Sequence, residues 1–169
     1  VNPQPGFRLN IGAYLHKAAL GMVYTDALSA LYHATAVRES RVGEAWALVE
    51  RYLTAFDQGA LPLTRSALLE SLHAAVPAFN AIPTRDGRFP RVGIVGEIYV
   101  KYNPFVNNDV AEWLMGHGCE VVLPPLMTFF SASLVNMSRA VQAHIQRPSL
   151  RALLAPVLGR YVEGFLGET

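Results

Sequence analysis

Side chains that could bind a ligand are concentrated between residues 97 and 108. This segment supplies one carboxylate, one cation, two phenols and three amides, carried by Glu97, Lys101, Tyr99, Tyr102, Asn103, Asn107 and Asn108. It follows an apolar run typical of a strand, and open α/β sheets bind ligands beyond the carboxyl ends of their strands. The amino terminus of a following helix would favour an anion there. We therefore expect these seven residues to line a ligand-binding loop.

The same segment also permits a purely structural interpretation. Ile98 and Val100 would then extend the strand, and Tyr102 and Phe105 would only pack against neighbouring elements. The length of the segment keeps the binding interpretation open, because loops of this kind usually need about 2–6 residues and residues 97–106 exceed that.

No other pattern in the sequence predicts catalytic or metal chemistry. The single cysteine, Cys119, leads directly into an apolar run and is expected to be a structural thiol. The histidines are not spaced as pairs of metal ligands. Gly93 and Gly96 lack the spacing of a dinucleotide- or phosphate-binding loop. The sequence therefore identifies no catalytic residue, no metal site and no cofactor held by this chain.

The candidate loop lies inside a predicted β-α-β unit. Residues 91–96 and 120–123 are short apolar runs bounded by glycine or proline, which is typical of buried strands. Between them we expect a helix that ends at Gly116 or Gly118. A strand, a helix and a second strand in this order predict a parallel crossover.

Helices are expected throughout the first half of the chain. Apolar residues recur there with helical spacing in three segments, residues 10–33, 40–59 and 64–74. Ser40 is the expected cap of the second helix, and Trp46 is expected on its buried face. Pro77 is expected to stop the third helix near Ala74 or to kink it.

The chain is expected to divide at a connector, residues 80–90, that contains prolines and a glycine. A helical segment, 1–83, would precede a partial Rossmann-like unit, 84–169, within one compact fold. Two further helices, at 127–145 and 148–166, are expected in the tail.

Two strands do not form a stable sheet alone. The expected fold is therefore α/β, with a helical front half, a Rossmann-like or flavodoxin-like β-α-β unit with few parallel strands, and a helical tail. The same reasoning predicts a fragment of a larger protein.

The composition limits the classes of partner. Of the 169 residues 51% are hydrophobic and 16% are charged, and the net charge is +1. Without a basic block, nucleic-acid binding is not expected. The longest uncharged stretch, residues 121–138, contains prolines and polar residues, so no membrane span is expected. The apolar surplus favours a surface covered by other domains of the parent protein or by a second copy. A single cysteine fits the reducing cytoplasm.

The β-α-β region resembles a known family. The run Arg91-Val-Gly-Ile-Val-Gly-Glu-Ile-Tyr-Val-Lys-Tyr-Asn-Pro-Phe-Val-Asn-Asn108, then Trp113-Leu114 and Gly118-Cys-Glu-Val-Val-Leu-Pro-Pro125, is similar to the dehydratase-subunit-like region of CoA-substrate-specific enzyme activase proteins. Those proteins belong to the 2-hydroxyacyl-CoA dehydratase and benzoyl-CoA reductase superfamily. The front half resembles the family more loosely, at Asp26-Ala-Leu28 and at Arg38-Glu39, where similar proteins carry an Arg-Pro-Tyr-Glu stretch.

The resemblance implies a link to anaerobic acyl-CoA chemistry. In that superfamily, ATP hydrolysis by an activator drives one electron into a dehydratase or reductase that bears cysteine-ligated 4Fe–4S clusters. A single cysteine cannot hold such a cluster, so the cluster and the ATP site would belong to the parent protein. This chain would contribute part of a substrate- or cluster-facing pocket or a docking surface, with an acyl-CoA as one candidate ligand. The alternative is a non-catalytic interaction or scaffold module.

Overall fold

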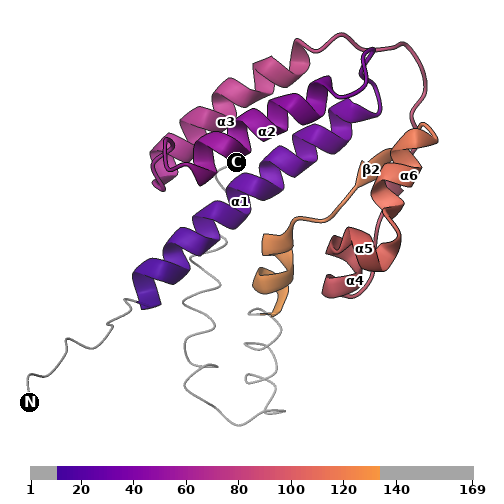
Figure 1. The fold of residues 1–169 in the computed structure, drawn as a ribbon. Coiled ribbons are helices and arrows are strands. Elements are labelled where there is room, and N and C mark those ends of the chain that lie inside the picture. Colours follow the sequence, from indigo (N-terminus) through magenta and orange to yellow (C-terminus); the bar gives the residue numbers. More distant parts are fainter. Residues whose placement is uncertain (1–10, 134–169) are drawn as a thin grey trace, which may run out of the picture. The chain divides into compact units, whose positions relative to one another are not determined.

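The computed structural model describes residues 11–133, and residues 1–10 and 134–169 lie outside that range. The described part is a mixed α/β fold that is mostly helical (Figure 1). Its elements in chain order are α1 (Ile11–Ala36), α2 (Glu44–Asp57), α3 (Arg65–Asn80), β1 (Arg91–Gly93), α4 (Ile98–Tyr102), α5 (Pro104–Asn107), α6 (Val110–Gly116) and β2 (Glu120–Val122). The chain divides into two compact units, 1–124 and 125–169, and all of these elements belong to the first.

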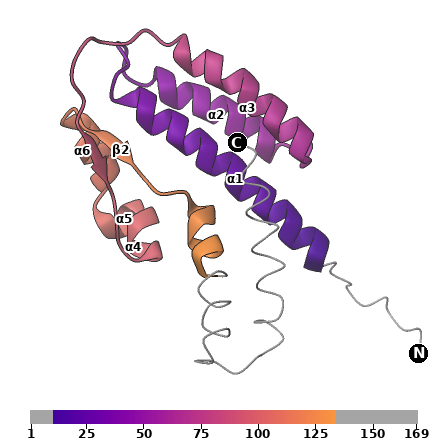
Figure 2. The same ribbon diagram turned by 180° about the vertical axis from the view of Figure 1, so that it is seen from behind.

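The three helices of the first half lie side by side, and α1 contacts both α2 and α3 (Figures 1 and 2). Tyr24 joins all three. Its buried ring on α1 stacks on Phe56 of α2 with 5.5 Å between the ring centroids, and its hydroxyl hydrogen-bonds to Ser71 of α3 at 2.9 Å. The predicted helical front half is therefore confirmed.

Two details of these helices differ from the sequence-based expectation. Of the two outcomes expected at Pro77, a kink or an early end, the early end is wrong, because helix α3 continues through Pro77 to Asn80. Pro77 is exposed and lies in the last turn, so the helix loses little more than the hydrogen bond of that one residue. Trp46 is 53% exposed. The buried face of α2 contains Ala45 and Val49, and Trp46, the residue after Ala45, projects from a different side of the helix.

The start of α2 is held by Glu39 and not by the expected Ser40, which is exposed. The buried carboxylate of Glu39 accepts hydrogen bonds from the backbone N–H groups of Gly43 and Ala45, each at 2.7 Å. Gly43, the N-cap residue, has a φ of 99°, which a residue without a Cβ adopts at little cost. A carboxylate at this end of the helix also complements its dipole.

The predicted parallel pairing of β1 and β2 is confirmed, with Gly93 opposite Val122. Both strands are shorter than expected. The pairing ends where the N–H of Ile94 donates to the carbonyl of Val122 at 3.1 Å. Val95, which was expected inside a buried strand, is 84% exposed, because the strand has already ended at Gly93.

A small apolar core joins the sheet to the end of α1 and to α6. Its buried members are Val37, Met115 and Val121. Six partly buried side chains pack around them: Tyr32, Ala36, Phe89, Ile94, Ala111 and Leu114. The sheet is therefore anchored through β2, whose residues contact both α1 and α6.

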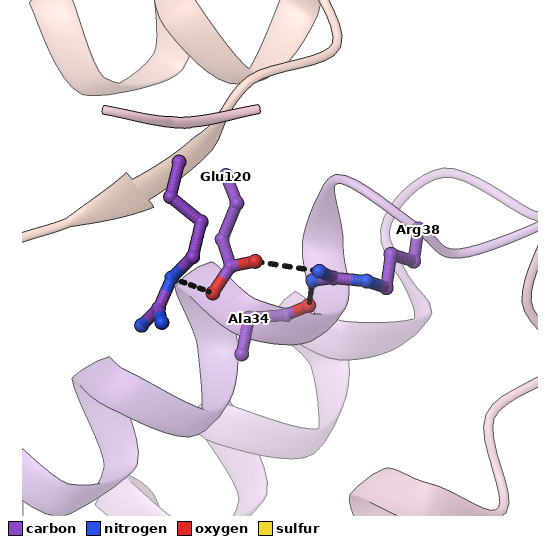
Figure 3. A network of polar contacts seen from close by, with 4 residues as sticks. Ala34, Arg38 and Glu120 are labelled. Carbon is purple, nitrogen blue, oxygen red and sulfur yellow. Dashed lines mark hydrogen bonds and ion pairs between the residues drawn. The ribbon is translucent and has the colours of Figure 1, made fainter. Parts of the chain in front are cut away.

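A buried carboxylate, that of Glu120 at the start of β2, strengthens this anchor (Figure 3). One of its oxygens pairs with Nη2 of Arg38 at 2.5 Å, and the other pairs with Nε of Arg91 at 3.1 Å. Arg38 also donates to the carbonyl of Ala34 in the last turns of α1, and its guanidinium lies 5.3 Å from the centre of the Phe89 ring. Charge pairing thus connects α1, β1 and β2.

The connector between α3 and β1 packs against the turn that follows α1. Glu39 and Thr84 form an antiparallel bridge, and the N–H of Ser40 donates to the carbonyl of Pro83 at 2.8 Å. Arg85 donates through its side chain to the carbonyl of Val37 at 2.9 Å. The expected division near residue 84 therefore lies inside the first compact unit.

The tail is described over a short stretch only. Residues 126–133 are helical, which includes the start of the helix expected at 127–145. The rest of that helix and the one expected at 148–166 lie outside the described residues. Within residues 11–133, no helix has the length and apolar character needed to cross a membrane.

The role of Glu39 predicts a specific loss of stability. Replacing Glu39 with Ala leaves the N–H groups of Gly43 and Ala45 without their acceptor and should lower the free energy of unfolding by about 2 kcal/mol. Ser40→Ala is the matched control and should change it by less than about 0.5 kcal/mol. Urea unfolding of the two variants measures the difference, and equal losses would contradict the assignment.

Candidate functional site

The segment expected to be a binding loop is folded into two short helices, α4 and α5. Glu97 caps α4, since its carboxylate accepts from the N–H groups of Tyr99 at 2.8 Å and Val100 at 3.2 Å. Asn103 caps α5, with its side-chain oxygen accepting from the N–H of Val106 at 3.3 Å. Neither an open loop nor an extension of β1 is present, because these two local caps favour helical turns.

Asn107 ties the end of this segment to the elements on both sides of it. Its side-chain amide donates to the carbonyls of Val100 at 3.0 Å and Lys101 at 3.2 Å in α4. Its side-chain oxygen accepts from the N–H of Val110, the first residue of α6, at 3.3 Å. The next residue, Asn108, has a left-handed φ of 54°, a conformation that asparagine tolerates better than most residues.

Tyr102 fixes α4 to the chain beyond β2. Its hydroxyl donates to the carbonyl of Pro124. Burial of the ring, together with the negative charge of Asp26, raises the pKa of Tyr102 above its ordinary value. The ammonium group of Lys101 lies 4.7 Å from the centre of the same ring, which is a cation–π contact.

The structure therefore gives most of the predicted site residues a role in folding. The side chains of Glu97, Asn103 and Asn107 bind backbone groups within the segment, whereas Tyr99 is 63% exposed. The side chains presented to solvent are mainly large and apolar. We define the apolar segment as the exposed residues Val95, Tyr99, Val100, Phe105 and Val106. Its geometry suits contact with another apolar surface rather than acid–base chemistry.

A cavity of about 300 Å³ between α1 and α2 is a second candidate site. Its lining is mainly apolar and aromatic: Thr25, Leu28, Ser29, Tyr32, His33, Trp46, Val49 and Leu53. The ring of Tyr32 is edge-on to those of His33, at 5.2 Å between centroids, and Trp46, at 5.6 Å. Sequence patterns do not predict this site, because Trp46 was expected on the buried face of its helix and the structure leaves it 53% exposed.

Two ionisable side chains that line the cavity, His33 and Tyr32, have shifted pKa values. Nδ1 of His33 lies 2.8 Å from the carbonyl of Ser29, which can only accept, so Nδ1 carries the proton and Nε2 is the acceptor. Burial lowers the pKa of His33. The hydroxyl of Tyr32 donates to Glu112 at 3.0 Å, and burial together with the Glu112 charge raises the pKa of Tyr32 to about 12.

The described residues do not fit an iron–sulfur cluster or another metal. Cys119 is the single cysteine of the chain and is half-buried beside β2. Within residues 11–133, no three side chains of the metal-ligating types come together. No family model, curated protein or solved structure matches this chain.

The contacts of Asn107 predict that it stabilises the fold. Asn107→Ala removes its hydrogen bonds to α4 and α6 and should lower the free energy of unfolding by about 1–2 kcal/mol. Asn80→Ala, at the exposed end of α3, is the control and should have little effect. Chemical denaturation compares them, and a neutral Asn107→Ala would leave this side chain available for ligand binding.

Acid should destabilise the protein through His33. The imidazole has a pKa of about 6.5 in an unfolded chain, and burial lowers it in the folded protein. As the pH falls below about 6.5 the unfolded state takes up the proton first, so the stability contributed by the neutral ring is lost. Urea midpoints at about pH 7.5 and 5.5 should differ less in His33→Gln than in the wild type. His73→Gln, whose ring is exposed, should retain the full difference.

Proposed function

We propose that this chain is a non-catalytic docking part of a larger cytoplasmic protein related to the 2-hydroxyacyl-CoA dehydratases and CoA-enzyme activases. The apolar segment is the contact surface, and its partner is another domain of that protein. The observation that carries the proposal is the exposure of the apolar segment, with Phe105 90% and Val95 84% exposed. Exposed apolar side chains that lie together on a surface, unlike single ones, mark interaction sites.

The folding roles of the neighbouring polar residues support a contact surface. Glu97 and Asn103 hold α4 and α5 in place by capping them, and Asn107 fixes both to α6. A rigid scaffold lowers the entropy that is lost when exposed side chains are covered by a partner. Phe105, the second residue of a capped helix, is then presented in a fixed position.

The link to acyl-CoA chemistry rests on the resemblance of residues 91–125. The most distinctive residues of that motif, Gly-Glu-Ile-Tyr and Asn-Pro-Phe, coincide with the caps and the exposed aromatic side chains of α4 and α5. In the parent protein this segment would face the substrate or the cluster, or would seat the neighbouring domain. The 4Fe–4S clusters, the ATP site and the acyl-CoA would belong mainly to that neighbour.

We further propose that β1 and β2 are part of a Rossmann-like sheet that the parent protein completes. The parallel register of the two strands supports this, because parallel pairs occur almost only in sheets whose faces are covered. The exposure of Val95, two residues after the end of β1, fits a strand that continues when a further strand is supplied. Slower amide exchange at residues 94–96 in the longer protein than in this chain would test the idea.

An interaction module without any connection to acyl-CoA is the second candidate, and the folding roles of Glu97, Asn103 and Asn107 favour it. The two functions predict different flanking sequences, with an iron–sulfur cluster and an ATP site expected there only for the acyl-CoA function. Anaerobic reconstitution of the longer protein should give the visible absorbance of an iron–sulfur cluster and ATP turnover if the acyl-CoA link holds. If both are absent, the module interpretation replaces it.

Substitution of Phe105 tests whether the apolar segment is the contact surface. Phe105→Ser should weaken binding of this chain to the separately expressed remainder of the parent protein by about tenfold or more, since a buried aromatic anchor is lost. Val42→Ser removes an equally exposed apolar side chain before α2, 95% exposed, and should change binding less than about twofold. Calorimetric titration gives the affinities. Equal effects of the two variants would exclude the apolar segment as the contact.

A further inference from the structure

We propose that the cavity between α1 and α2 binds a small aromatic molecule that carries one hydrogen-bond donor, such as a phenol. This proposal does not depend on the docking function, because the cavity residues are not part of the apolar segment. The juxtaposition that carries it is an aromatic-lined hollow of about 300 Å³ with the acceptor nitrogen of a half-buried histidine among its lining residues.

The cavity has the shape of a one-sided pocket. Leu28 and Val49, which are buried, close its inner end. Thr25 of α1 and Trp46 of α2 also line it but are exposed, so they mark its opening. A cavity of about 150 Å³ already holds a benzene molecule, and ligand pockets begin at about 300 Å³. The size therefore fits one substituted ring.

The aromatic lining favours a flat ligand. Tyr32 is held in place by the hydrogen bond of its hydroxyl to Glu112, and the rings of His33 and Trp46 meet it at 64° and 72°. Edge-to-face and offset contacts of this kind stabilise aromatic pairs beyond the burial of area alone. An inserted ring would add further contacts of the same type with Trp46, a residue that is 53% exposed.

His33 defines the polar group of the ligand. Because Nδ1 donates to the carbonyl of Ser29, Nε2 is an acceptor. Among residues 11–133, no hydrogen bond to Nε2 is found. The half-buried, neutral ring can therefore accept a hydrogen bond from a ligand, and a hydroxyl on the ligand is a suitable donor. Ser29 and Thr25 contribute little, since the hydroxyl of Thr25 already donates to backbone carbonyls of α1.

Three probes separate the parts of this proposal: 4-methylphenol, toluene and 4-methylcyclohexanol. In the Trp113→Phe background Trp46 is the single tryptophan, so its indole N–H gives one signal in ¹H–¹⁵N NMR spectra of the chain. We expect 4-methylphenol to shift that signal saturably, with a Kd on the order of 1 mM. Toluene, which has no donor, should bind about tenfold more weakly, and 4-methylcyclohexanol about fivefold more weakly.

Two substitutions locate the binding. His33→Leu should bring 4-methylphenol to the affinity of toluene and leave toluene unchanged. Thr25→Phe should fill the opening and weaken both by about tenfold, with little effect on the fold because Thr25 is exposed. Arg51→Ala, in a separate hollow between α2 and α3, is the control and should change nothing. Circular dichroism and thermal melting check that each variant is folded.

Each negative result overturns a stated part. An unsaturable shift, or equal binding to Thr25→Phe, excludes the cavity as a ligand site. Equal affinities for toluene and 4-methylphenol exclude the role of His33, and equal affinity for 4-methylcyclohexanol excludes the aromatic preference. If His33→Leu does not fold, the wild type at a pH where His33 is protonated replaces it. The preference for 4-methylphenol over toluene should then disappear. Glu112, which accepts from the Tyr32 hydroxyl, is a charged group that also acts on the His33 ring.

Discussion

The carboxylate of Glu120 lies between two guanidinium groups where the sheet meets the long helix α1. A buried charge is costly unless it is paired, so Glu120 requires both Arg38 and Arg91 to be close. Arg38 lies in the turn that follows α1, and Arg91 is the first residue of β1. The pairing therefore brings together three elements that are distant in sequence, and the short sheet takes its position from it (Figure 3).

The residue after Arg38 serves the other half of the fold. Glu39 points its carboxylate at the first N–H groups of α2, and its backbone bridges to Thr84 in the connector. Two adjacent residues of opposite charge thus have separate roles: Arg38 holds the sheet, and Glu39 holds the start of α2 after α1. The cavity that Trp46 borders is lined by residues of these two helices. The turn that contains Arg38 and Glu39 thus helps to position both the sheet and the helix α2 that lines the cavity.

Sequence patterns predicted the elements whose signals are local and long. The helices of the first half follow from apolar periodicity, and the two parallel strands follow from short apolar runs bounded by glycine or proline. The cap of α2 could not be found in this way, because Glu39 lies four residues before Gly43 and reaches it only through the shape of the turn. The burial of Val95 was overestimated for a related reason, since a strand is buried only where a partner covers it. The cavity combines Tyr32 and Trp46, which no spacing rule connects, and the hydroxyl of Tyr32 is held by Glu112 from a third helix, α6.

The segment from 97 to 108 shows why an inventory of polar residues is a weak guide to function. Carboxylates and amides bind backbone N–H groups as readily as they bind ligands, and a short segment with several of them satisfies its own backbone first. The side chains of Glu97, Asn103 and Asn107 bind backbone groups of the segment itself. Apolar side chains, above all Phe105, cannot form such bonds and remain exposed to solvent. The surface chemistry of the segment is therefore mainly that of its exposed apolar side chains, and the proposed docking role rests on them.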